Sequence, residues 1–179
     1  ETSCAPKGDE PKCEELPDGS VLLSSRKQGG RYFNVFRYTD VDEARGVWGA
    51  PADSKTAPGG ISNEGGACNG EILIIPVRNA QGRRTHLALQ SVPAGPARSH
   101  VTLYWKALDR PADYNTPLRF ASHWDGSYEV TAAGSAYSTM TLQADGRIGF
   151  FYEEEPGYYQ MVYRALELSD ITGGRYRAD

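Results

Sequence analysis

The apolar runs of this chain are short, and turn residues bound nearly all of them. Few of these runs keep a helical period over three turns, and 20 glycines and 11 prolines interrupt the sequence. Short apolar runs between turn residues are typical of β-strands. We predict strands at Val21–Ser25, Tyr32–Tyr38, Glu71–Val77, Thr85–Ser91, Val101–Ala107, Ser138–Leu142, Ile148–Tyr152 and Gln160–Ala165. The fold class is therefore all-β, and composition alone leaves a sandwich, a barrel and a propeller open.

Asp-Gly pairs at 18–19, 125–126 and 145–146 indicate hairpin turns, because both residue types tolerate positive φ. The hairpins at 15–23 and 142–150 are similar to each other, which is weak internal repetition on the scale of a propeller blade. At about 40–45 residues per blade, the chain holds roughly four blades at most. Long loop-rich stretches at 46–66 and 110–124 take up part of the chain, which favours about three blades. One helical turn is expected around Ser169–Ile171.

Charge and cysteine usage exclude several functions. The net charge of −4 gives no basic surface for nucleic acid, and no apolar run is long enough to span a bilayer. The cysteines and histidines are scattered without metal-ligand spacing, so no metal site is expected; they are Cys4, Cys13, Cys68, His86, His100 and His123. The sequence leaves open whether Cys4 and Cys13 form a disulfide.

Tyr137 lies among small residues, just before a strand–Asp-Gly–strand pattern. This setting allows it to present its hydroxyl group, although most tyrosines pack their ring and the chain contains 11 of them. The residues that single out Tyr137 as a functional candidate are Glu10, Arg26 and Arg98.

Several motifs occur in one order along the chain: Asp9-Glu10 with 15–26, then 67–73, 96–102, 135–140 and 149–153. Each motif alone is weak, but the ordered set is specific. Over residues 9–176 the chain resembles the C-terminal half of the catalytic domain of bacterial exo-α-sialidases, the retaining neuraminidase family. The resemblance implies a six-bladed β-propeller, of which this chain supplies roughly three blades. Residues 1–179 are then the C-terminal part of one catalytic domain, and the N-terminal blades lie outside it.

The resemblance implies that Tyr137 is the catalytic nucleophile. Sialic acid carries a carboxylate on its anomeric carbon, so a neutral phenol avoids the repulsion that a carboxylate nucleophile would meet. A phenol with a pKa near 10 needs an adjacent base. Glu10 occupies the place of that base in the motif, and Glu14 is the alternative.

The substrate carboxylate suits guanidinium groups, whose planar fork binds it through two hydrogen bonds. The family uses three arginines, and Arg26 and Arg98 match the second and third. Arg31 competes with Arg26 for this assignment, and Arg119 competes with Arg98.

Glu153 matches the acid that supports the first arginine of the family, with the neighbouring acids Glu154 and Glu155 as weaker candidates. Asn69 resembles a polar residue that faces the hydroxyl end of the sugar, although a turn role before Gly70 is equally compatible.

One departure from the family is large. The first arginine and the aspartate acid/base have no counterpart in this chain, and residues 38–48 are at most a degraded copy of the Ser-x-Asp-x-Gly-x-x-Trp box. The chain would therefore be a C-terminal fragment or one chain of a cleaved enzyme. The 110–124 loop lengthens the spacing from Arg98 to Tyr137, and we expect it to shape the aglycone side.

The expected function is an exo-α-sialidase that removes terminal sialic acid with retention. Two alternatives stay open: a sialic-acid-binding propeller without catalysis, and a trans-sialidase. The resemblance implies no metal or organic cofactor. The expected partners are sialylated glycans or glycoproteins and the N-terminal remainder of the enzyme, with neither nucleic acid nor a transmembrane segment. The expected location is secreted, periplasmic or at the cell surface.

Overall fold

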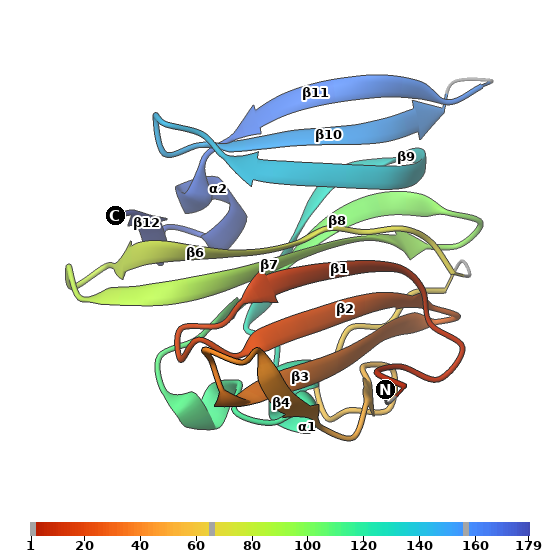
Figure 1. Ribbon diagram of the computed structural model, residues 1–179. Helices are drawn as coiled ribbons and strands as arrows, with labels where there is room; N and C mark the ends of the chain where they lie inside the picture. Colours follow the sequence, from red (N-terminus) through yellow and green to blue (C-terminus); the bar gives the residue numbers. More distant parts are fainter. Residues whose placement is uncertain (1–2, 65–66, 156–157) are drawn as a thin grey trace.

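The computed structural model describes residues 3–64, 67–155 and 158–179, which form two antiparallel sheets (Figure 1). The five-stranded sheet has the order β1-β2-β3-β4, with the short β5 paired to β3. Its strands are β1 (Asp9–Glu15), β2 (Val21–Lys27), β3 (Gly30–Asp40), β4 (Arg45–Trp48) and β5 (Ala52–Asp53).

The seven-stranded sheet has the order β11-β10-β9-β8-β7-β6-β12. Strands β6 to β11 pair antiparallel in chain order, and β12 returns to pair with β6. The strands are β6 (Ile72–Asn79), β7 (Arg84–Gly95), β8 (Ser99–Ala107), β9 (Gly126–Leu142), β10 (Ile148–Glu155), β11 (Gln160–Leu166) and β12 (Tyr176–Ala178).

The long strand β9 takes part in two ladders. Its first part pairs with β8 from Gly126 to Gly134, and its second part pairs with β10 from Gly134 to Leu142. In Figure 1, β9 accordingly runs from beside β8 up to the layer of β10 and β11. The strands thus fall into three groups, β1–β4, β6–β9 and β9–β11, with β9 common to the last two.

An aromatic cluster joins the short helix α1 (Pro117–Ala121) to the five-stranded sheet. Phe120 and Phe33 are both fully buried, and their ring centroids lie 5.0 Å apart. Trp124 packs on both rings, at 5.9 Å from Phe33 and 5.7 Å from Phe120. The helix begins where Thr116 accepts a hydrogen bond from the Arg119 amide, a common N-cap arrangement. This packing holds the connection between β8 and β9 against β3.

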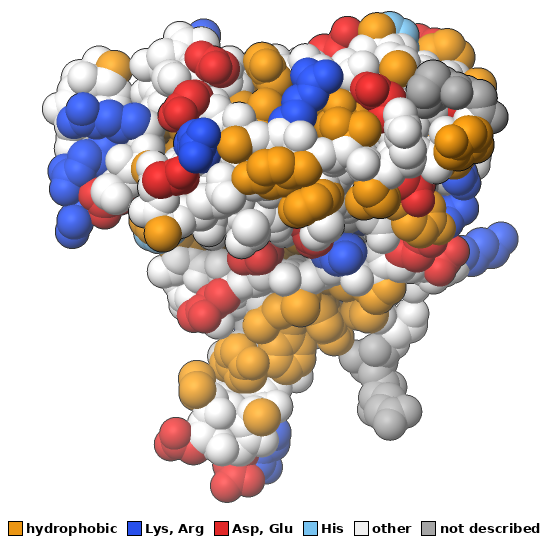
Figure 2. Space-filling model, turned by 90° about the horizontal axis from the view of Figure 1, so that it is seen from above, with side chains coloured by type: hydrophobic (Ala, Val, Ile, Leu, Met, Phe, Trp, Pro, Cys, Tyr) orange, Lys and Arg blue, Asp and Glu red, His pale blue; other side chains and the backbone are white. Residues whose placement is uncertain are grey.

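A second apolar core is formed by residues of the seven-stranded sheet together with α2 (Leu168–Thr172). Its fully buried members include Leu87, Leu89, Leu103, Ile148 and Phe150. The opposite face of β10 and β11 is different. Phe151 and Tyr163 pack ring against ring at 4.8 Å there and stay 45% and 46% exposed. Figure 2, which views the molecule from above these strands, shows hydrophobic side chains gathered among charged ones.

Each predicted strand overlaps an observed one, and α2 matches the predicted helical turn. The sequence patterns missed β1, β4, β5, β12 and the first part of β9. Strand β1 reads Asp-Glu-Pro-Lys-Cys-Glu-Glu and buries no residue fully, so hydrophobicity gave no signal. Cys4 and Cys13 are free thiols, so the disulfide between them is not formed. Within the described ranges, no helix is long and apolar enough to cross a membrane.

Candidate active site

The structure brings three of the predicted site residues into direct contact. The Tyr137 hydroxyl donates a hydrogen bond to Oε1 of Glu10. Nη1 of Arg26 lies 3.3 Å from the Tyr137 hydroxyl oxygen and 2.9 Å from the same Glu10 oxygen. Tyr137 is 38% exposed, so its hydroxyl group is accessible from solvent. A phenol, a carboxylate and a guanidinium thus meet at one accessible point, although they are far apart in sequence.

A local irregularity in β1 directs Glu10 to this point. Arg26, the last residue but one of β2, pairs with Asp9, and the pairing of β1 with β2 shifts between Asp9 and Lys12. Glu10 lies inside this irregularity with a φ of 44°, in the left-handed region that is uncommon for residues other than glycine. The Asp9 carboxylate accepts a hydrogen bond from the Glu10 amide at 2.9 Å. The bulge therefore turns the Glu10 side chain toward Tyr137.

Glu153 supports the backbone of Tyr137. Its Oε2 accepts a hydrogen bond from the Tyr137 amide at 3.0 Å. The β9–β10 register shifts between Tyr152 and Glu154, which leaves this amide free for a side-chain partner. The arginine that Glu153 is expected to support has no counterpart in this chain; among the described residues, the Glu153 carboxylate holds the backbone amide of Tyr137.

Arg98 lies on the turn between β7 and β8, where Ala97 and Arg98 have positive φ, as does His100 at the start of β8. The Arg98 carbonyl accepts a hydrogen bond from the Ser135 amide at 2.7 Å, two residues before Tyr137. Such rarely populated backbone conformations concentrate at functional sites. The Arg98 backbone is thus tied to the strand that carries the phenol.

The Arg98 side chain contacts the segment around Asn69. Its Nη2 donates to the Ala67 carbonyl at 3.0 Å. Arg31 donates to the carbonyls of Cys68 and Gly70, on either side of the half-buried Asn69. Asn69 therefore lies in a segment held between two arginines. Among the described contacts, its side chain forms no hydrogen bond with the Tyr137 hydroxyl group or with Glu10.

The pKa values of the contacting pair move apart. Burial raises the pKa of Glu10, but hydrogen bonds from Tyr137 and Arg26 and the charges of Arg26 and Arg31 outweigh it, so this pKa lies below 4.5. The hydrogen bond to Glu10 raises the pKa of Tyr137 above 10.0, and Arg26 opposes this only in part. At neutral pH the pair is consequently a neutral phenol beside a carboxylate, as a base and its proton donor require.

Geometry separates the predicted residues from their alternatives. Burial and the charge of Glu71 raise the pKa of Glu14, which accepts a hydrogen bond from the Ile74 backbone and not from Tyr137. Arg31 is fully buried, unlike Arg26. Glu154 accepts a hydrogen bond from the Tyr152 hydroxyl at 3.2 Å, away from the Tyr137 amide. The remaining alternatives are equally separate from the contact: Arg119 lines a distant cavity, and Glu155 lies beside Gly134.

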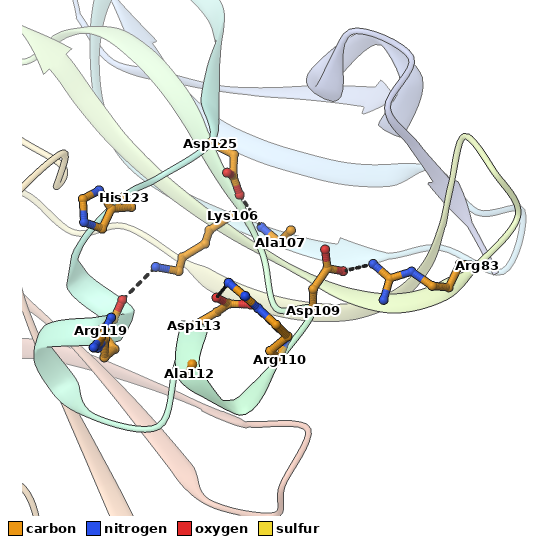
Figure 3. A pocket seen from close by; sticks show the side chains of 10 residues that line it. All are labelled: Arg83, Lys106, Ala107, Asp109, Arg110, Ala112, Asp113, Arg119, His123 and Asp125. Carbon is orange, nitrogen blue, oxygen red and sulfur yellow. Dashed lines mark hydrogen bonds and ion pairs between the residues drawn. The ribbon is translucent and has the colours of Figure 1, made fainter.

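That cavity, of about 490 Å³, lies at the other end of β8 (Figure 3). Lys106, eight residues beyond Arg98 and hence roughly 26 Å along the strand, is 3% exposed and donates to the carbonyls of Arg119 and Ser122. Desolvation lowers its pKa to about 8. A lysine that binds the last carbonyls of a helix is a structural cap. The 110–124 loop, which we expect to shape the aglycone side, packs on β3 and around Lys106, at the end of β8 away from Arg98.

No family model matches this chain. It is 30% identical over 172 residues to a sialidase from Micromonospora viridifaciens, which covers 91% of this chain and 23% of the relative. It also matches the crystal structure of the intramolecular trans-sialidase from Ruminococcus gnavus in complex with oseltamivir carboxylate, with a TM-score of 0.67 and 18% identity over 91% of this chain and 33% of that one.

The chain is thus related to the sialidase family and corresponds to part of such an enzyme. Its all-β antiparallel architecture fits a partial β-propeller of a few blades, which confirms the predicted fold class. Among the described residues, no group of three or more His, Cys, Asp or Glu side chains could hold a metal ion.

Proposed function

We propose that this chain carries the nucleophilic half of a retaining exo-α-sialidase active site. The observation that carries the proposal is the contact of the Tyr137 hydroxyl with Glu10, with Arg26 against both. A protein that only binds a sugar acid has no need of a phenol hydrogen-bonded to a carboxylate. A nucleophilic phenol does need it, because its own pKa is too high for ionisation at neutral pH.

In the first step, the Tyr137 oxygen attacks the anomeric carbon and its proton passes to Glu10. The bond from the anomeric carbon to the leaving oxygen breaks, and an acid outside this chain protonates that oxygen. Arg26 and Arg98 bind the substrate carboxylate, and Asn69 faces the hydroxyl end of the sugar. Glu153 keeps the Tyr137 backbone in place through its amide.

In the second step, a water molecule attacks the anomeric carbon and gives a proton to the same outside group. The bond to Tyr137 breaks, and the phenol oxygen takes its proton back from Glu10. Two displacements at one carbon release sialic acid with its original α configuration. No metal or organic cofactor enters either step.

The proposal includes residues that this chain does not supply. We infer that 1–179 form the C-terminal part of a single catalytic propeller, and that preceding blades of the same polypeptide or a partner chain bring the acid and a first arginine. The chain spans about a quarter of the curated relative it matches, which supports this. The exposed apolar face with Phe151 and Tyr163 offers a surface on which a further blade would pack.

The substrates would be sialylated glycans or glycoproteins, and such substrates place the enzyme in a secreted, periplasmic or cell-surface location. The first test is the hydrolysis of an aryl sialoside by the full-length protein that contains this chain. Tyr137→Phe should abolish ordinary turnover. Tyr163→Phe is the matched control, because the only hydrogen bond of the Tyr163 hydroxyl group among the described contacts is with Gln143. A Tyr137→Phe enzyme with the wild-type kcat/KM would exclude the nucleophile role.

The same assay separates the alternatives. A sialic-acid-binding propeller would bind the sialoside without releasing the aryl group. A trans-sialidase would release it and place the sialic acid on an added acceptor or within the product itself, which mass spectrometry of the products identifies.

A further inference from the structure

Arg31 is a buried cation whose role the proposed reaction does not explain. Its side chain is fully buried in β3, and the described residues contain no ion pair to it. Burial lowers its pKa to about 10, so the group is still charged at neutral pH. Buried charges are normally paired because their desolvation is costly. The charges of Glu10 and Glu71 act on Arg31 only from beyond contact distance among the described residues, so its N–H donors bind other acceptors.

All the described acceptors of the Arg31 guanidinium are neutral. Nε donates to the Ser24 hydroxyl at 3.1 Å, Nη1 to the Cys68 carbonyl at 3.0 Å and Nη2 to the Gly70 carbonyl at 3.4 Å. Two of these three acceptors belong to residues 67–70, which have no regular secondary structure. Arg31 therefore supplies the hydrogen bonds that a strand partner would otherwise give this segment.

The same segment contacts Arg98. Its Ala67 carbonyl accepts a hydrogen bond from Nη2 of Arg98 at 3.0 Å. A guanidinium has five N–H donors, so this contact leaves others free for a substrate carboxylate while it fixes the orientation of the group. The position of the 67–70 segment thus sets the position of the Arg98 fork.

We propose that Arg31 is a positioning residue that acts on Arg98 through the 67–70 segment. The proposal rests on the proposed function, in which Arg98 binds the substrate carboxylate. Arg31 holds the Cys68 and Gly70 carbonyls, the segment presents the Ala67 carbonyl, and that carbonyl orients Arg98. Lysine cannot substitute for it, because a single ammonium group does not span three separated acceptors as the planar fork does.

Ser24 provides a matched control in the same buried network. Its hydroxyl accepts from Arg31 and donates to Gln90 at 2.6 Å, but it has no described contact with residues 67–70. Ser24→Ala should therefore weaken the fold while both carbonyl contacts of Arg31 persist. If Arg31 had a merely structural role, Arg31→Gln and Ser24→Ala variants with the same loss of stability would show the same hydrogen exchange and the same ligand affinity.

The first measurement is hydrogen exchange in the full-length protein without ligand. Arg31→Gln should lose protection at 68–70 and at Ser135, whose amide bonds the Arg98 carbonyl, whereas Ser24→Ala should retain it. Arg31→Lys serves as the second variant where Arg31→Gln does not fold, with the same expected loss. Wild-type protection at 68–70 in a folded Arg31 variant would overturn the proposal.

The second measurement is the affinity for oseltamivir carboxylate and for its ester, which lacks the carboxylate charge. Arg31→Gln should weaken carboxylate binding roughly 10-fold, leave ester binding unchanged, and have no further effect in an Arg98→Ala background. Undiminished carboxylate affinity, or full additivity with Arg98→Ala, would overturn the proposal. A wild-type protein that neither binds the carboxylate nor cleaves a sialoside would refute the proposed function instead, and hydrogen exchange would still decide whether Arg31 holds the segment.

Discussion

Glu10→Gln is the substitution that tests the chemistry of the site most directly. Glutamine has the size of glutamate, and its amide oxygen can still accept the hydrogen bond from Tyr137, but it cannot take up the proton. A positioned general base contributes about 10²–10⁴-fold to a rate. The expected loss in kcat is of that size, which corresponds to about 3–5 kcal/mol of transition-state stabilisation.

The effect on KM should have the opposite sign. Arg26 lies 2.9 Å from the Glu10 carboxylate, and the two side chains are 20% and 22% exposed. Two unit charges at that distance in water attract by about 1.4 kcal/mol, and measured values for accessible pairs are about 1 kcal/mol or less. Removal of the Glu10 charge leaves Arg26 freer for an anionic substrate, so KM should stay constant or fall by up to roughly fivefold.

The assay is steady-state hydrolysis of an aryl sialoside by the full-length protein, with Glu14→Gln as the matched control. Glu14 is an acid of the same strand without a contact to Tyr137, so its variant should stay within about twofold of wild type. A Glu10→Gln enzyme within threefold of the wild-type kcat would refute the base assignment. An equal loss in Glu14→Gln would show that the effect comes from the charge of the strand and not from contact with the phenol.

Three further outcomes are expected. Arg26→Met should raise the pKa of the Glu10 carboxyl, because Arg26 lowers this pKa through a hydrogen bond and its charge. A ¹³C NMR titration measures the pKa, and an unchanged or lower value would contradict the prediction. Glu153→Ala should lower kcat roughly 10-fold, because the hydrogen bond to the Tyr137 amide is lost. Glu153→Gln can still accept this bond through its side-chain oxygen, so its kcat should stay within about threefold of wild type. Equal losses in the two variants would contradict a role of Glu153 in positioning Tyr137. Phe120→Ala should cost about 3–5 kcal/mol in urea unfolding, whereas Leu118→Ala on the same helix, 56% exposed, should cost little; similar midpoints would contradict the aromatic anchoring of α1.

The sequence was sufficient for elements whose apolar residues alternate or cluster. Strands β2, β7 and β8 bury most of their residues, and their runs stood out for that reason. Strand β1 carries almost only charged and polar side chains, because it buries no residue fully and is held by its pairing with β2. A strand of this kind leaves no periodic hydrophobic signal, so its existence follows only from the partner strand.

The site was predictable in its residue types but not in its connections. Motif order pointed to Tyr137, Glu10 and Arg26, and the structure brings these three into contact. Two features had no sequence signal. The left-handed backbone at Glu10 is a property of a bulge that needs the β1–β2 pairing, and Arg31 differs from a surface arginine only once β3 is buried.

The double pairing of β9 has a consequence for how such chains can be rearranged. The strand that carries Tyr137 is also the last strand of the preceding group, so no loop separates the two groups at that point. A chimera that exchanges one group alone must join foreign and native sequence inside a strand, within a few residues of Tyr137. Residues 72–166 should therefore be transferable between related proteins only as one block. The exposed residues 110–112, which precede α1, offer a better point for a tag or an insertion.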